Sequence, residues 1–239
     1  MAIDVTLPLD YQNYAASFTT TNGTQCKILV DKNIPAVMAA IPGESALPGE
    51  ATVRQRVYTG GVRVIDGTVS SSDGTARSLL VYEGIESTVF ANMGAPTITG
   101  QNTVNRTAGS FIADGYKVGD QVMGFGHATA SNDGVAVIVT AVAALALTLN
   151  GTPFTNETIA AAYRLFRTVQ KTRIPVALNA GNTDSTPSVP LFGANQGQDK
   201  SIDTSGVSLG AAGALIVGMQ AAISALPAQI YVQAKAARY

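Results

Sequence analysis

TVNRTAGSFIADGYKVGDQVMGFGHATASNDGVAVIVTAVAALALTLNG, residues 103–151, is the stretch of sequence that decides the fold. Turn-forming pairs divide it at short intervals, with Asp114-Gly115 near its start and Asn150-Gly151 at its end. Such pairs between apolar, β-branched runs are the strongest local signal for β-hairpins. The stretch therefore predicts a small β-sandwich or barrel-like module with its own core.

Turn formers and core formers recur through this module in a fixed order. They are Arg106, Thr107, Gly109, Ser110, Phe111, Ile112, Asp114, Gly115, Tyr116, Gly119, Asp120, Asn132, Asp133, Gly134, Ile138, Val142, Leu145, Leu147, Thr148 and Leu149. This pattern, which spans about a fifth of the chain, resembles a β module that recurs in tail-tube, decoration and similar virion proteins of tailed bacteriophages. The resemblance implies a structural setting and brings no catalytic residue with it.

Sequence on both sides of the module predicts further strands. Alternating runs occur at residues 53–57, 61–65 and 77–82 before it, and at 163–169 and 173–178 after it. Strands that flank a compact unit on both sides indicate an insertion, because insertions succeed at exposed sites whose ends are adjacent. We therefore expect a discontinuous main β domain at residues 20–95 and 165–239, with the inserted β module at 96–164.

Apolar residues near the C-terminus repeat at helical spacing: Leu215, Ile216, Met219, Ile223 and Leu226. They predict one C-terminal helix over residues 212–226, which Pro227 would end, and a short strand over 230–234. No charged residue occurs between Asp203 and Lys235. Glutamine and proline residues interrupt this run, however, so the sequence favours a packed helix over a membrane span.

Composition narrows the class of protein further. Of 239 residues, 46% are hydrophobic and only 13% are charged, about half the usual charged share. A surface with so little charge favours an assembly in which neighbours cover much of it. The 15 basic and 16 acidic residues form no runs, which argues against direct nucleic-acid binding. The single cysteine, Cys26, excludes an internal disulfide and fits assembly in the reducing host cytoplasm.

Catalytic and metal-binding patterns are incomplete. Gly206 to Gly210 fits the G-x-S-x-G pattern of a serine hydrolase, but no Asp, Glu or His follows Ser208. His127, the only histidine, follows Gly126 in the module, where a turn role is expected. One His and one Cys do not form a transition-metal site. We expect that the protein is not an enzyme and that it has no catalytic, cofactor-binding or metal-binding residues and no cofactor. A serine hydrolase is the less favoured alternative.

Two groups of residues are candidates for contacts between subunits. They are the aromatic residues Tyr11, Tyr14 and Phe18, and the clustered basic residues Arg54, Arg56 and Arg63. The aromatic residues lack a helical stripe, so we expect residues 1–19 to be an N-terminal arm; a poorly ordered terminus is the alternative. The arginines alternate on an expected strand, as a solvated or subunit-facing row.

These observations lead to an expectation about function. We expect a structural protein of the virion of a tailed bacteriophage, acting as a capsid decoration or cement protein. Its partners would be the major capsid protein and copies of itself in a homo-oligomer, without direct nucleic-acid or membrane contact. A tail-tube or other tail protein is the alternative, because rings of such proteins need the same β surfaces.

Overall fold

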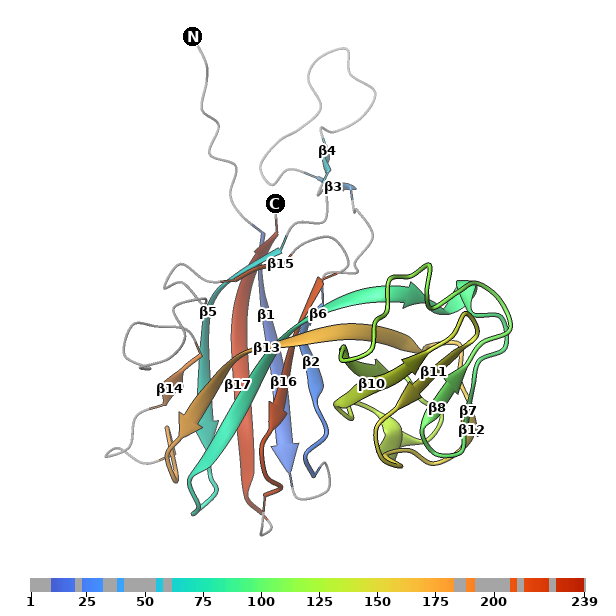
Figure 1. Ribbon diagram of the computed structural model, residues 1–239. Helices are drawn as coiled ribbons and strands as arrows, with labels where there is room; N and C mark the ends of the chain where they lie inside the picture. Colours follow the sequence, from blue (N-terminus) through green and yellow to red (C-terminus); the bar gives the residue numbers. More distant parts are fainter. Residues whose placement is uncertain are drawn as a thin grey trace, which may run out of the picture.

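The computed structural model describes residues 10–19, 23–31, 38–40, 55–57, 62–182, 188–191, 207–209, 213–223 and 227–238. Its regular elements are strands and two short 3-10 turns, η2 (Phe90–Asn92) and η3 (Ala130–Asn132), which confirms the expected mainly β fold. Figure 1 shows two lobes, of which the smaller is formed by the middle of the sequence.

One sheet, called the outer sheet here, belongs to the larger lobe. Its strands lie in the order β1 (Asp10–Thr19), β17 (Gln229–Arg238), β5 (Val62–Ser71) and β14 (Val189–Pro190), and β15 (Val207–Leu209) also pairs with β5. All pairings are antiparallel. Side chains alternate between the core and the exposed face, as expected of an antiparallel sheet with one covered face.

A second, longer sheet runs through both lobes. Its order is β12 (Glu157–Thr158), β7 (Thr97–Thr99), β8 (Thr103–Asn105), β11 (Ala146–Leu149), β10 (Val137–Val142), β9 (Gln121–Phe125), β13 (Arg164–Val176), β6 (Arg77–Val89), β16 (Gly213–Met219) and β2 (Lys27–Asp31). Separately, β3 (Met38–Ala40) pairs with β4 (Gln55–Val57).

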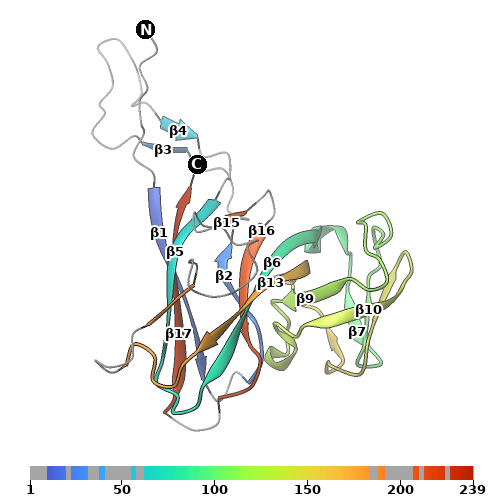
Figure 2. The same cartoon turned by 60° about the vertical axis from the view of Figure 1, so that its left-hand side comes forward.

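Strands β6 and β13 join the lobes. Each is 13 residues long, and they pair from Val176 opposite Arg77 to Arg164 opposite Val89. Figures 1 and 2 show both strands extending from the larger lobe into the smaller one. The chain therefore leaves for the smaller lobe at Val89 and returns directly beside that point at Arg164, a geometry suited to an insertion.

The described residues form three apolar clusters. The first lies between the outer sheet and strands β2, β6, β13 and β16, and the second lies inside the smaller lobe. The third cluster occupies the junction and consists of Cys26, Tyr82, Met123, Phe166, Ala214 and Ile216. Residues of both lobes thus share a core, so the lobes are coupled by packing as well as by the chain.

The predicted C-terminal helix is wrong over residues 213–219, which form strand β16. All seven residues are buried, because β16 lies between β6 and β2 and is covered on both faces. Leu215 and Val217 belong to the first core, whereas Ala214 and Ile216 belong to the third. A strand buried on both faces reads as a continuous apolar run, which spacing does not distinguish from a helix.

The expected N-terminal arm is wrong for residues 10–19, which form edge strand β1. All ten pair with β17, and the side chains of Ala16 and Phe18 are buried in the first core. The relevant period is two, which places these even-numbered residues on the core face. Residues 1–9 lie outside the described residues.

Part of the module pattern is explained by a buried arginine, Arg106. The Nη1 atom of Arg106 donates to Asp114 Oδ2 at 2.6 Å, and Nη2 donates to the carbonyl of Asn92 at 2.8 Å. Its guanidinium lies 4.8 Å from the ring centre of Phe111. Gly109 has a φ of 75°, and a side chain there would collide with the Arg106 guanidinium. These residues hold the first loop of the module in shape and need no catalytic explanation.

Asp114→Ala should destabilise the module by about 3 kcal/mol, because it leaves the Arg106 guanidinium buried without its carboxylate partner. Urea unfolding followed by circular dichroism measures this loss. Asp120→Ala is the matched control, since Asp120 Oδ2 accepts only the backbone N–H of Lys117 at an exposed turn. Equal losses for the two variants would show that the Arg106–Asp114 pair contributes little.

Replacing residues 90–163 with Asn-Gly should leave a folded larger lobe, because Val89 and Arg164 already pair and a two-residue turn can connect them. We expect a lower melting temperature, since Phe166 loses its edge-on contact with Phe125. Thermal unfolding by circular dichroism tests this prediction. A chain without a cooperative transition would mean that the lobes fold only together.

Candidate assembly surface

Side chains on the exposed face of the outer sheet form three rows across β1, β17 and β5. The rows are Ser17–Tyr231–Ser70, Ala15–Gln233–Thr68 and Asn13–Lys235–Asp66, and we call them the outer-sheet grid. The residues that alternate with them along the strands, such as Val232 and Ala234, are buried on the opposite face of the sheet. The grid thus follows from strand alternation and register, which bring together residues from three distant parts of the sequence.

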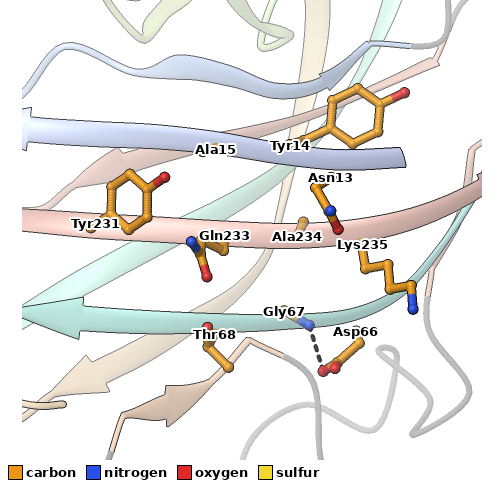
Figure 3. A pocket seen from close by; sticks show the side chains of 10 residues that line it. All are labelled: Asn13, Tyr14, Ala15, Asp66, Gly67, Thr68, Tyr231, Gln233, Ala234 and Lys235. Carbon is orange, nitrogen blue, oxygen red and sulfur yellow. Dashed lines mark hydrogen bonds between the residues drawn. The ribbon is translucent and has the colours of Figure 1, made fainter. Parts of the chain in front are cut away.

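A hollow of about 610 Å³ lies over the grid. Figure 3 shows its lining, including Asn13, Gln233 and Thr68. Gly67 lies in β5 at this point, where a side chain would come within 2.7 Å of the carbonyl oxygen of Gln233. Asp66 Oδ1 accepts a hydrogen bond from the Gly67 N–H at 2.7 Å, the dashed line in Figure 3.

The charge on the grid sums to zero. Asp66 and Lys235 are its ionisable acidic and basic residues, and they lie directly opposite one another in one row. Amide and hydroxyl side chains supply most of the remaining polar groups, and they both donate and accept hydrogen bonds. The surface is therefore suited to a partner without net charge at the point of contact.

The outer edge of β1 adjoins the grid. No strand within the described residues pairs with this edge. Lys27 Nζ donates to the carbonyl of Ser17 at 2.5 Å. In β17, the carbonyl of Gln229 accepts the N–H of Ser72, so the odd-numbered residues of β17 face β5 and the even-numbered ones face β1. Because the backbone groups of successive residues in an antiparallel strand point to alternate sides, those of Asn13, Ala15 and Ser17 face the open edge. The even-numbered residues point toward β17.

The structure collects some of the predicted contact residues and separates others. Tyr11 and Arg63 both lie opposite Ala237, so their backbones share the row that follows the grid. Tyr14 is half-buried and lines the hollow. Arg56 lies on β4 opposite Ala39. Arg54 lies outside the described residues.

The prediction that Phe18 contacts a neighbouring subunit is wrong. Its side chain is fully buried within its own chain, so it is unsuited to contact a neighbouring subunit. Tyr231 and Gln233 are exposed at the grid and were missed by sequence reasoning. The available signal was the strict alternation of apolar residues with longer polar ones over residues 229–236.

His127 is buried beside a carboxylate, and its two ring nitrogens have different surroundings. Its Nδ1 lies 2.5 Å from Glu157 Oε1, and Glu157 Oε2 accepts the N–H of Thr129 at 2.6 Å. Its Nε2 is buried and has no hydrogen-bond partner among the described residues. Tyr163 packs edge-on against the imidazole at 4.7 Å, and Phe154 lies 5.7 Å away.

The pair formed by His127 and Glu157 holds a loop in place and is too buried to contact a substrate. The side chains of His127 and Glu157 are 1% and 5% exposed. Burial lowers the pKa of His127, although Glu157 acts in the opposite direction. Burial also raises the pKa of Glu157, but hydrogen bonds from Thr129 and His127 outweigh that effect and leave it lowered. A neutral imidazole therefore donates to a carboxylate and holds the loop at residues 127–129 against β12.

Other reactive groups do not form a site. Ser208, the candidate nucleophile, lies within strand β15 opposite Arg63 rather than at a strand-to-helix turn. Burial raises the pKa of the Cys26 thiol to about 12, so the nucleophilic thiolate is not formed at neutral pH. In the part of the chain that the structure describes, no three His, Cys, Asp or Glu residues group as metal ligands. The same part has no helix that is long and apolar enough to cross a membrane.

Comparisons of the chain with protein-family models, with curated proteins and with solved structures find no match.

Acid should weaken the fold through His127. Because burial lowers its pKa in the folded state, the unfolded chain binds the proton more readily, and this contribution to stability is lost as the pH falls below about 6.5. Urea unfolding between about pH 7 and pH 5 should show a shallower decline for His127→Gln than for the original protein. Parallel declines would exclude His127 as the source.

Proposed function

We propose that this protein is a structural protein of the virion of a tailed bacteriophage and acts as a capsid decoration or cement protein. The observation that carries the proposal is the open edge of β1 beside the neutral outer-sheet grid. The resemblance of the module to virion β modules gives independent support. In this role the protein supplies contact area and performs no reaction.

An open edge of this length favours assembly. β1 is ten residues long, and exposed strands of this kind pair readily with other chains unless something covers them. Lys27 binds the carbonyl of Ser17, near one end of this edge. A strand from a neighbouring subunit could add to this edge by main-chain hydrogen bonds.

The smaller lobe offers a second contact surface. Ile112, Val118 and Leu145 are 59%, 67% and 47% exposed there, and large apolar side chains gain from being covered. Two surfaces on one chain can bridge two capsid subunits, and the first contact raises the effective concentration for the second. Each Å² of apolar surface covered contributes about 25 cal/mol before ordering costs.

The proposed partners are the major capsid protein and copies of this protein in a homo-oligomer. The location is the virion, assembled in the host cytoplasm. Cofactors, nucleic acid and membranes have no part in this function. Bridges between capsid subunits would oppose the outward pressure of the packaged DNA.

A tail-tube protein is the second candidate, and the strand order favours it for one reason. β1 and the two-residue strand β14 lie at opposite sides of the outer sheet, so copies placed side by side could continue the sheet around a ring. Stoichiometry separates the two candidates. A fixed ratio to the major capsid protein in tailless heads supports decoration, whereas presence only in detached tails supports the tube.

Ala15→Pro tests the proposed use of the β1 edge. Proline removes a backbone N–H that faces the open edge, a position where strands tolerate it, so the isolated variant should melt within about 5 °C of the original protein. Its retention on purified heads should fall at least about tenfold, and decorated heads should rupture at lower temperature. Heating heads with each form measures this.

Ala16→Pro is the contrasting variant, because its N–H points toward β17 and its side chain is buried in the core. It should lower the melting temperature of the isolated protein. Full retention of folded Ala15→Pro on heads would contradict the proposed edge contact. Equal rupture temperatures with and without the original protein would contradict the cement role.

A further inference from the structure

Tyr231 stands between two hollows on the exposed face of the outer sheet. The hollow of about 610 Å³ lies toward Lys235, and a smaller one of about 100 Å³ lies toward Gln229. Tyr231 lines both. Lys235 lies six positions after Gln229 in β17, which corresponds to about 20 Å along the strand. The two hollows therefore form one elongated track that suits a chain of linked units.

The aromatic ring at the middle of this track is accessible. Tyr231 is 39% exposed. Figure 3 shows its ring face-on to the exposed side of the sheet. An aromatic face carries partial negative charge and attracts weakly positive C–H groups. A ring so placed is a platform for a flat, C–H-bearing surface.

Polar groups without net charge line the rest of the track. Gln233 and Thr68 lie opposite one another beside Tyr231, with Asn13 in the next row. The smaller hollow is lined by Ser70, Ser71, Ser72, Gly181, Asn182, Gln229 and Tyr231. Amides and hydroxyls donate and accept hydrogen bonds, as do the hydroxyl groups of sugars.

We propose that this track binds a neutral oligosaccharide chain. One sugar ring stacks on Tyr231, and its neighbours hydrogen-bond with Gln233 and Thr68 on one side and with the serine-rich hollow on the other. The inference goes beyond the capsid role and does not depend on it. The β1 edge binds through its backbone, whereas the track uses side chains that point away from the sheet.

The chemistry of the track excludes the other common classes of ligand. A nucleic acid or an acidic polysaccharide needs an excess of positive charge, yet Lys235 lies opposite Asp66. A lipid or an apolar peptide needs an apolar groove, yet amide and hydroxyl side chains dominate the lining. Hydroxyl-rich rings with apolar C–H faces match both the aromatic platform and the polar flanks.

Titration calorimetry of the full chain with maltohexaose, cellohexaose and chitohexaose tests the proposal, with a polygalacturonate hexamer as the acidic probe. We expect at least one neutral probe to bind with a Kd of about 1 mM or tighter, and the acidic probe to bind at least about tenfold more weakly. Tyr231→Ala should weaken binding at least about tenfold, whereas Tyr231→Phe should keep it within about threefold. Gln233→Ala should weaken binding about fivefold.

Gln170→Ala is the control, because it removes an exposed amide from β13, outside the track. It should bind as the original protein does. Thermal unfolding of each variant shows that the fold is kept. Failure of all three neutral probes to bind, equal binding by Tyr231→Ala, or preference for the acidic probe would each overturn the proposal. None of these results bears on retention of the protein on heads.

Discussion

The antiparallel pairing of β6 with β13 is the constraint on which the rest of the structure depends. The larger lobe builds a sandwich on one part of this ribbon, and the smaller lobe extends the sheet from the other. Arg164 marks the transition, because its guanidinium binds both Asp31 at the end of β2 and Glu86 on β6. A break in the ribbon would separate the core of the larger lobe from that of the smaller lobe, which the third cluster now joins at the junction.

Local turn chemistry made the module predictable from sequence. Asn150 illustrates this, because its side-chain Oδ1 accepts the N–H of Ile138 and its own N–H binds the Ile138 carbonyl. Gly151 then takes a φ of 69°. These two residues are only 12 positions apart in the chain, so the pattern of turn formers predicts strands and their connections without knowledge of the whole fold.

Features set by distant contacts could not be predicted in the same way. The two strands expected at residues 163–169 and 173–178 are one strand, β13, because the polar residues between them form a bulge opposite β6 rather than a turn. The sequence of β16 was mistaken for a helix because both faces of this strand are buried, which makes its residues continuously apolar. The outer-sheet grid depends on the register among residues near 15, 68 and 233, which local spacing does not specify. Tyr14 was selected from sequence and does line the hollow, but its neighbours there came from the structure.

The shared ribbon also determines how the protein carries mechanical load. A pull on the smaller lobe along the ribbon is transmitted through β6 and β13 together, because both enter that lobe side by side. Within the larger lobe, the load acts parallel to the strands on the β6–β16 ladder, which runs from Gly213 to Met219. Hydrogen bonds loaded in this direction must yield together rather than one after another. A pull on the smaller lobe along the ribbon is therefore resisted by a whole ladder of backbone hydrogen bonds at once.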